Sequence, residues 1–380
     1  GMTDRWHTRP VRYQHTVEYE VVNAPNIFHR QNLALLSVGR TENARRFVVI
    51  DSNVEKHYSA AIRDYFSYHH VESKIVTFPA GEENKTADHY LSIIRELDAF
   101  PIHRRDEPII AIGGGVLTAV VGFVASSYRR GVPHIKVPTT LMGYVDASIG
   151  IKTGINFNGN KNRVGAFHAP QMVLLDKFFL KTLPRRHILN GVCEIIKLAI
   201  IKDAELFRLL EVYGVQSVDA HFQDEQGAII LDRAIAGMLE ELQRNLFEEE
   251  LARKVDFGHT FSYGLEMRHE AHLFHGEAVL LDILVSTLIA RERNLLSEEE
   301  TNRIFRLTHT LGITLDTSML DPHLLWHSLA ERTYHRNGLQ RVPMPCGIGN
   351  CIFLNDITKE EIESAAKALS DWIPVSPEIA

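Results

Sequence analysis

The chain has little of what would place it in a specialised class of protein. It has 380 residues but only three cysteines, too few for a disulfide framework, and no apolar run approaches the ~20 residues of a membrane helix. Acidic residues outnumber basic ones, 48 to 41, so no overall positive field attracts nucleic acid or an anionic membrane. The first residues are polar and charged, unlike a secretory signal. We therefore expect a cytoplasmic protein that binds neither nucleic acid nor membrane.

What the chain does have is the composition of a globular protein and the length of two domains. Hydrophobic residues make up 45% and charged residues 23% of the chain. In the first half, short β-rich apolar runs alternate with helical patterns, which is typical of a mostly parallel sheet covered by helices on both faces. The expected strands are 47–50, 75–78, 108–112, 134–137 and 172–175, with an edge strand within 16–22. The expected helices among them are 54–69, 86–100 and 116–126.

The second half changes character and is dominated by helical periodicity. The expected helical stretches are 187–212, 226–246, 259–268, 277–293 and 298–311. We therefore predict an α/β domain over residues 1–182 and an all-α domain over residues 183–380, joined without a linker. The cleft between two such domains is the expected place for a ligand.

A glycine triplet, Gly113–Gly115, stands between an expected strand and an expected helix. Glycines there let the backbone approach a pyrophosphate, and the helix N-terminus offers free N–H groups to the anion. Asp51, Glu82 and Lys85 also follow expected strand ends, where ligands bind in such sheets. A simple tight turn and ordinary helix caps are the alternative interpretation of these residues.

The segment 138–165 is dense in cations, amides and hydroxyls. Such groups beside a glycine-rich turn suit the recognition of a phosphate or a polyol. A long polar surface loop has the same composition, so the residues alone leave both interpretations open.

The helical half holds candidates for a metal site. Glu194 and Lys197 lie three residues apart in an otherwise apolar helical run, where both need partners. With His259 and His275, Glu194 completes the one-carboxylate, two-imidazole ligand set of a catalytic zinc site. His269 and His272 compete for the same role, and a histidine on an apolar helix is often a satisfied core residue.

Taken together, these motifs resemble those of the sugar phosphate cyclases, the superfamily of 3-dehydroquinate synthase. The resemblance spans roughly residues 45–355 and keeps that superfamily's order and spacing. The motifs are Gly113–Gly115, Gly122-Phe123, Tyr128–Gly131, Pro138–Leu141, Val145–Gly154, Lys161-Asn162, Gly191–Lys197, Phe257–His259 and Phe274–Glu277.

The resemblance implies an N-terminal nucleotide-binding α/β domain, an all-α metal-binding domain and a homodimer. It implies NAD as a cofactor, held by Asp51, Asn53, Glu82, Lys85, Gly114, Gly115, Val116, Thr139, Thr140, Lys161, Thr182 and Leu183. It implies one divalent metal, zinc or else cobalt, on Glu194, His259 and His275. The residues implied on the substrate side are Asp146, Lys152, Asn162, Lys197, Asp256 and His335, with Arg130 reaching the phosphate site of the neighbouring subunit.

Two positions favour one branch of this superfamily. The arginine that serves the substrate carboxylate in dehydroquinate synthases is Ala252 here, and Asp256 replaces an asparagine. Because an acid repels a carboxylate, we expect a sugar phosphate without one, sedoheptulose 7-phosphate. Asp256 together with His335 resembles the 2-epi-5-epi-valiolone synthases, which imply transient oxidation by NAD, phosphate elimination, reduction and aldol closure. The alternatives are 3-dehydroquinate synthase, the desmethyl-4-deoxygadusol and 2-epi-valiolone synthases, and a polyol dehydrogenase.

One departure bears on the cofactor. The superfamily has an aspartate four residues after the glycine triplet, and this chain has Ala119. Loss of a charge-assisted bond to the cofactor costs about 1.5–3 kcal/mol, or roughly one to two decades in affinity. A catalytically weakened, ligand-binding relative is therefore a further alternative.

Overall fold

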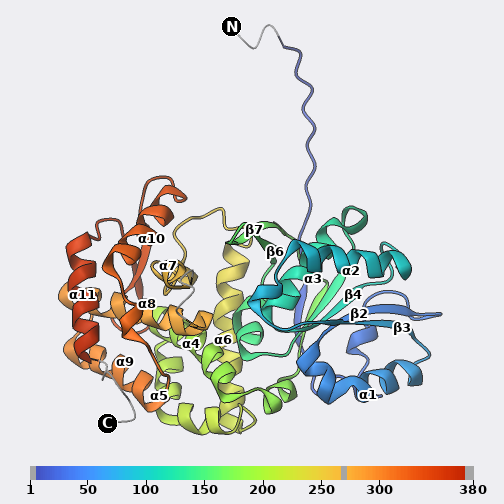
Figure 1. Ribbon diagram of the computed structural model, residues 1–380, viewed down its shortest axis with the longest axis horizontal. Helices are drawn as coiled ribbons and strands as arrows, with labels where there is room; N and C mark the ends of the chain where they lie inside the picture. Colours follow the sequence, from blue (N-terminus) through green and yellow to red (C-terminus); the bar gives the residue numbers. More distant parts are fainter. Residues whose placement is uncertain (1–5, 267–271, 373–380) are drawn as a thin grey trace.

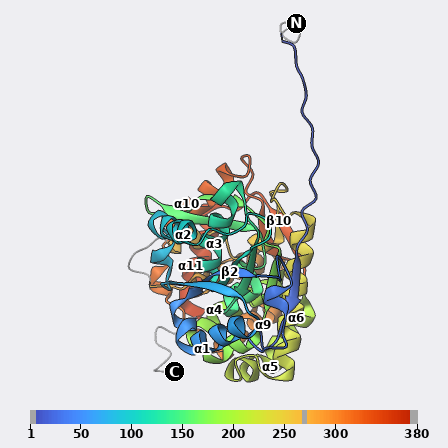
Figure 2. The same cartoon turned by 90° about the vertical axis from the view of Figure 1, so that its right-hand side faces the viewer.

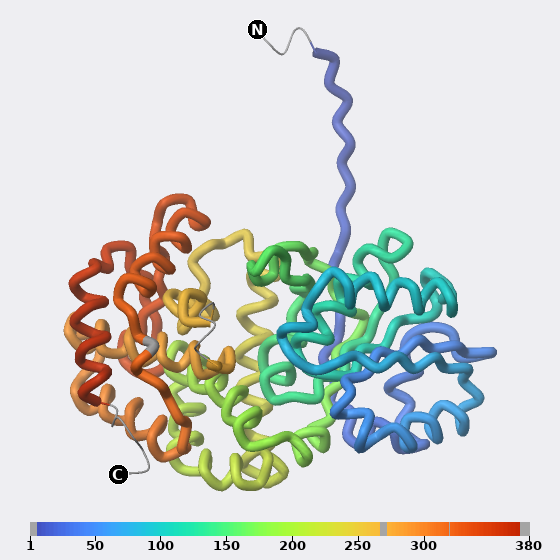
Figure 3. The backbone as a smooth tube through the Cα atoms, in the orientation of Figure 1, coloured from blue at the N-terminus to red at the C-terminus, as the bar shows by residue number. Residues whose placement is uncertain are grey.

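The computed structural model describes residues 6–266 and 272–372. Its α/β part and its helical part lie side by side, as Figure 1 and the tube in Figure 3 show. The described segment before β1 (Glu20–Asn23), which starts at residue 6, extends away from both parts. It exposes Val11 and Tyr13 almost fully to solvent.

The N-terminal half is built on one six-stranded parallel sheet, as the alternating pattern predicts. Its order is β1-β8-β5-β4-β2-β3, and every pair of neighbours is parallel. The strands after β1 are β2 (Arg45–Asp51), β3 (Glu72–Phe78), β4 (Ile109–Gly113), β5 (His134–Pro138) and β8 (Met172–Leu175). The expected edge strand is confirmed as β1, although it begins only at Glu20.

The sheet is covered on both faces because alternate side chains of its apolar strands need partners on opposite sides. Val48 and Ile50 pack with α1 (Ser52–Tyr68) on one face, and Phe47 and Val49 pack with α2 (Ala87–Ala99) and α3 (Gly115–Ser127) on the other. Figure 2 views the molecule from the side of this α/β part. The order in which strands are added to the sheet reverses between the neighbouring parallel strands β2 and β4, since β3 lies on one side of β2 and β4 on the other. At such a switch point the carboxyl ends of parallel strands form a crevice.

The polar segment 138–165 is not an irregular loop. It begins with a π-helical turn, η5 (Gly143–Ala147), and continues as an antiparallel hairpin of β6 (Lys152–Phe157) and β7 (Asn160–Phe167). Asn158 and Gly159 connect the two strands with positive φ angles of 51° and 72°. The Asn-Gly pair is the preferred sequence of such a hairpin turn, so a signal for the hairpin is present in the sequence.

The C-terminal half is helical, as predicted, with one correction. The stretch 187–212 forms two helices, α4 (Arg185–Lys202) and α5 (Ala204–Asp219), because the side chain of Asp203 accepts a hydrogen bond from Leu206 N and caps α5. The following helices are α6 (Glu225–Arg244), α7 (Ser262–Glu266), α8 (His275–Glu292), α9 (Glu298–Thr310), α10 (Pro322–Tyr334) and α11 (Lys359–Trp372). A two-stranded sheet of β9 (Val342–Pro345) and β10 (Cys351–Leu354) and the last two helices were not predicted.

The short helical turns complete the chain: η2 (Ala34–Leu36), η3 (Glu82–Asn84), η4 (Tyr128–Arg130), η6 (Lys177–Thr182), η7 (Lys254–Asp256) and η8 (Thr317–Met319). The predicted domain boundary falls between η6 and α4 and stays a prediction. The largest core crosses it, since Leu141 and Val145 of the α/β part pack in the same cluster as α4 and α8. Among the helices described, none combines the length and the apolar character needed to span a bilayer.

The packing at this boundary allows a test of stability. A Cβ at Gly191 of α4 would lie only 2.5 Å from Leu141 Cγ and 2.8 Å from Leu141 C. We expect Gly191→Ala to lower the free energy of unfolding by about 1–3 kcal/mol, because overpacking forces the backbone apart. Gly237→Ala on α6 is the matched control, since its methyl group would meet only Lys202 Cδ at 3.7 Å. The control should be neutral or stabilising by up to ~1 kcal/mol, and equal urea midpoints for the two variants would contradict the expectation.

Candidate active site at the domain junction

A single cavity of about 1790 Å³ runs from the strand ends of the sheet to the helical half. It is lined by all twelve residues predicted to bind the cofactor: Asp51, Asn53, Glu82, Lys85, Gly114, Gly115, Val116, Thr139, Thr140, Lys161, Thr182 and Leu183. Of the predicted substrate residues, Asp146, Lys152, Asn162, Lys197 and Asp256 line it as well. The structure therefore brings together residues that are as far apart in the sequence as Asp51 and Asp256.

Two predicted residues lie elsewhere. Arg130 is exposed at the end of η4, and His335 is exposed at the end of α10, and neither is among the residues that line the cavity. Their assignment to the substrate stays a prediction. The competing His272 reaches the cavity but does not join the group of possible metal ligands, and His269 lies outside the described residues.

The end of the cavity at the sheet, where the cofactor is predicted to bind, combines backbone N–H groups with the Asp51 carboxylate. Gly114 and Gly115 begin α3 directly after β4, and the first N–H groups of a helix have no carbonyl partner within it. The glycines are also needed for packing, because a Cβ at Gly115 would lie 2.8 Å from Ala147 Cβ. Asp51 caps α1 by accepting a hydrogen bond from Asn53 N at 2.8 Å, and burial raises the pKa of this carboxyl. A phosphate at α3 and a hydroxyl donor at Asp51 fit these groups.

The hairpin β6–β7 forms a wall of the cavity and is hydrogen-bonded to the segment around η3, between β3 and α2. Asn156 Nδ2 donates to Glu82 Oε1 at 3.2 Å, and Asn156 N donates to Lys85 O at 2.8 Å. Lys85 Nζ contacts Asn162, whose own N–H donates to Asn156 Oδ1 at 2.9 Å. Burial lowers the pKa of Lys85. The hairpin therefore positions Asn162 and its neighbour Lys161 at the cavity.

The metal candidates converge where the helical half meets the cavity. Glu194 is fully buried on α4, and its Oε1 lies 3.6 Å from His259 Nε2 and 3.2 Å from His275 Nε2. Lys197, one turn further along α4, places Nζ 2.7 Å from Glu194 Oε2. One ligand atom from each of Glu194, His259 and His275 lies within 4.8 Å of the other two, which matches the predicted triad.

In both imidazoles Nδ1 contacts a neighbouring oxygen, and Nε2 is directed at Glu194. His259 Nδ1 lies 3.1 Å from Phe257 O, and His275 Nδ1 contacts the carboxylate of Glu266. A carbonyl or carboxylate on the far ring nitrogen is the usual support of a metal-bound histidine. The sequence analysis did not predict Glu266, because no motif or residue spacing distinguishes it from the other acidic residues of the helical half.

Electrostatics favour a cation at this triad. Burial by itself would raise the pKa of Glu194, but Lys197 and the two histidines lower it well below its usual value. Burial lowers the pKa of His259. Neither carboxylate oxygen of Glu194 has a well-aligned hydrogen bond among the described residues, despite its close cationic neighbours. A fully buried carboxylate with unfilled acceptor sites beside two imidazoles fits a divalent metal such as zinc.

Asp256 requires a correction of the sequence analysis. The sequence predicts that its charge repels a substrate carboxylate, but its side chain is buried among Arg253, Arg332 and Arg336. Burial would raise its pKa, but the three arginines lower it to about 2. Because three guanidinium groups surround one carboxylate, Asp256 does not present a net negative charge to the cavity, and the repulsion argument fails. Arg332 and Arg336 were missed because they come from α10 and the segment after it.

Comparison with known proteins identifies the family. The model of the 3-dehydroquinate synthase N-terminal region matches residues 75–190, and that of the C-terminal region matches residues 191–333. The chain belongs to the 3-dehydroquinate synthase-like sugar phosphate cyclases. The predicted fold class and family are thereby confirmed.

Among members of this family, the chain is 48% identical to a 2-epi-5-epi-valiolone synthase of Streptomyces albus, over 93% of this chain and 88% of the relative. It is 32% identical to a 3-dehydroquinate synthase of Prochlorococcus marinus, over 95% and 97%. The structure of ValA, the 2-epi-5-epi-valiolone synthase of Streptomyces hygroscopicus subsp. jinggangensis, has NAD+ and Zn2+ bound. It matches with a TM-score of 0.91 and 42% identity, over 96% of this chain and 99% of that one.

The metal triad gives a direct test of the site. We expect Glu194→Gln to weaken Zn2+ binding more than 100-fold, because loss of a ligand exceeds the ~10–100-fold effect of an outer-shell change. Competition with a chromophoric chelator at pH 7.5 measures the affinity. Glu107→Gln is the control, since Glu107 is also a buried carboxylate but lies just before β4, at the end of the strand away from the glycines and the cavity. If both variants bound zinc as the parent chain does, the triad would not be the metal site.

Proposed function

We propose that the chain is a 2-epi-5-epi-valiolone synthase that converts sedoheptulose 7-phosphate to the carbocycle and inorganic phosphate. The observation that supports this most is the nearly full-length similarity to several synthases of that name, at 43–48% identity, against 32% for the dehydroquinate synthase. The geometry agrees, because His259 and His275 of the metal triad and the glycines directly after β4 line one cavity.

The proposed cofactors are NAD and one divalent metal, zinc by preference. NAD would lie along Gly114, Gly115 and Asp51, and the metal would lie on Glu194, His259 and His275. When bound, these two groups supply a hydride acceptor that is restored in each cycle and a Lewis acid for vicinal oxygens of the sugar. Because the hydride returns, the reaction is a phosphate-eliminating lyase reaction and not a net oxidation.

The chain's own residues bind and orient the substrate. Lys197, held 2.7 Å from Glu194, is placed to stabilise an oxyanion beside the metal site. Lys152 and Asn162 would bind the phosphate, and Asp146 would orient the nicotinamide side of the cofactor. Lys152 now pairs with Glu248, so phosphate binding requires an exchange of partners. Because the Lys152 side chain is 66% exposed, its ion pair is weak and the exchange costs little.

We also propose that the protein is a homodimer in the cytoplasm. In the extended arm before β1, apolar residues stand at alternate positions from Val11 to Tyr19 with His15 as the one exception, a strand-like pattern, and Val11 and Tyr13 are exposed. The three cysteines, Cys193, Cys346 and Cys351, are free, which suits a reducing compartment. Light scattering on the full chain measures the oligomeric state.

The activity itself is tested by incubating the protein with NAD, zinc and sedoheptulose 7-phosphate. We expect phosphate release and a carbocyclic product, identified by mass and NMR, without accumulation of NADH. The substrate of 3-dehydroquinate synthase is the matched control and should release no phosphate. Net NADH formation, or turnover of the control substrate alone, would contradict the proposed function.

Ala119 provides a second test, because it lines the cavity on α3 four residues after Gly115. We expect Ala119→Asp to raise NAD affinity about tenfold by adding a charge-assisted hydrogen bond. Ala119→Asn is the control for the hydrogen bond without the negative charge. Ser127→Asp is the control for the negative charge alone, since it adds that charge at the exposed end of α3. Titration calorimetry measures the affinity. A parent chain without turnover, together with tighter NAD binding in Ala119→Asp, would favour the weakened relative instead.

A further inference from the structure

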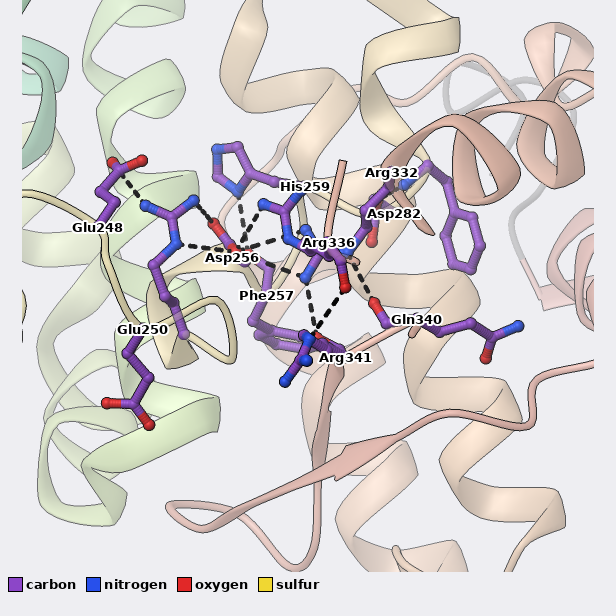
Figure 4. A network of polar contacts seen from close by, with 12 residues as sticks. Glu248, Glu250, Asp256, Phe257, His259, Asp282, Arg332, Arg336, Gln340 and Arg341 are labelled. Atoms are coloured by element: carbon purple, nitrogen blue, oxygen red, sulfur yellow. Dashed lines mark hydrogen bonds and ion pairs between the residues drawn. The ribbon is translucent and has the colours of Figure 1, made fainter. Parts of the chain in front are cut away.

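The buried cluster around Asp256 connects the metal site to the C-terminal segment of the chain. Asp256 ends η7, three residues before His259, and its side chain is 9% exposed. Arg332 and Arg336 reach it from 76 and 80 positions away, as Figure 4 shows. A contact between segments so distant in sequence fixes their relative positions once the chain is folded.

The contacts with Asp256 use both of its carboxylate oxygens. Arg253 binds in a bidentate manner, with Nη2 2.6 Å from Oδ1 and Nε 3.1 Å from Oδ2. Arg336 Nη2 lies 3.0 Å from Oδ2, and Arg332 Nη2 lies 3.4 Å from the same oxygen. Planar guanidinium groups hold a carboxylate in a defined orientation, which a flexible ammonium group does not.

The arginines are themselves held by the backbone of their own segment. Arg332 Nη2 donates to Arg341 O at 2.9 Å, and Arg341 Nε donates to Arg336 O at 3.2 Å. The Gln340 side chain exchanges two hydrogen bonds with the backbone of Ile357, at 2.8 and 2.9 Å. The segment from Arg332 to Arg341, which we call the C-terminal platform, is therefore held in place by several hydrogen bonds and faces Asp256 (Figure 4).

On the other side, the turn that carries Asp256 presents His259. His259 N donates to Asp256 O at 2.8 Å, and His259 Nδ1 lies 3.1 Å from Phe257 O. Gly258 has a φ of 82°, and a Cβ there would lie 2.7 Å from Val279 Cγ1 of α8. The direction of the imidazole is thus set by a turn whose first residue is fixed by the arginines.

We propose that Arg332 and Arg336 are positioning residues of the metal site, which act through Asp256 to orient the turn bearing His259. The proposal rests on the part of the proposed function that places a metal on the triad. It assigns the C-terminal platform a role in metal affinity, although neither arginine lines the cavity.

The test compares the full-length variants Arg336→Met and Arg303→Met. Arg303 makes an equivalent bidentate pair with Glu211, at 3.0 and 2.6 Å, which lies outside the residues of the cavity. We expect Arg336→Met to weaken Zn2+ binding about 10–100-fold and to shift the absorption bands of the Co2+-substituted protein. Arg303→Met should leave both unchanged, even if it lowers the urea midpoint by a similar amount. Equal zinc affinities in the two variants would overturn the proposal.

Two further variants keep the test decisive if an arginine loss disturbs folding. Arg336→Lys keeps the positive charge and should recover part of the zinc affinity. In an Asp256→Asn background, Arg336→Met should have little additional effect on zinc binding, because both changes break the same link. Fully additive effects would overturn the proposal.

The outcome is separable from that of the proposed function. A chain that binds zinc and responds as expected, but does not turn over sedoheptulose 7-phosphate, would refute the substrate assignment alone. A parent chain that binds no zinc would overturn the positioning role and the metal assignment together.

Discussion

The burial of one carboxylate organises much of this molecule. Glu194 lies on α4, where every residue from Gly191 to Ile201 is buried, and an unpaired charge there would cost several kcal/mol. Its compensation comes from Lys197 on the same helix, from His259 in the turn between η7 and α7, and from His275 at the start of α8. The same contacts that pack α4 against α8 and against the turn bearing His259 therefore also assemble the candidate metal site. The arginines around Asp256 extend these contacts to the end of α10.

Features with local signals could be predicted from the sequence. The strands follow from short β-rich runs between helical patterns, and their apolar character on both faces indicates a covered parallel sheet. The triad could be proposed because Glu194 and Lys197 are anomalous in an apolar helix. The residues at strand ends could be grouped because parallel strands bring their carboxyl ends to one edge.

Features that depend on contacts between distant segments could not be predicted from the sequence. The sequence shows Arg253 beside Asp256, but two of the three arginines that surround this carboxylate, Arg332 and Arg336, come from distant positions and have no local signal. Glu266 reaches His275 only through the folding of α7 against α8. The hairpin β6–β7 is a different case, since the Asn158-Gly159 turn is a local signal that was overlooked because its strands are polar rather than apolar.

The cavity has two walls of different chemistry. This difference suits the proposed cyclisation, in which the substrate and the product have the same oxidation level. The sheet wall presents backbone and helix caps, which are rigid. The helical wall presents charged side chains, and Lys161–Glu266 and Lys152–Glu248 connect it to the hairpin. A redox-neutral cyclisation requires the substrate to stay in place while hydride leaves and returns. Partly exposed ion pairs contribute only about 0–1 kcal/mol each, so the phosphate proposed to bind Lys152 would replace Glu248 at low cost, while the buried Glu194–Lys197 pair remains fixed.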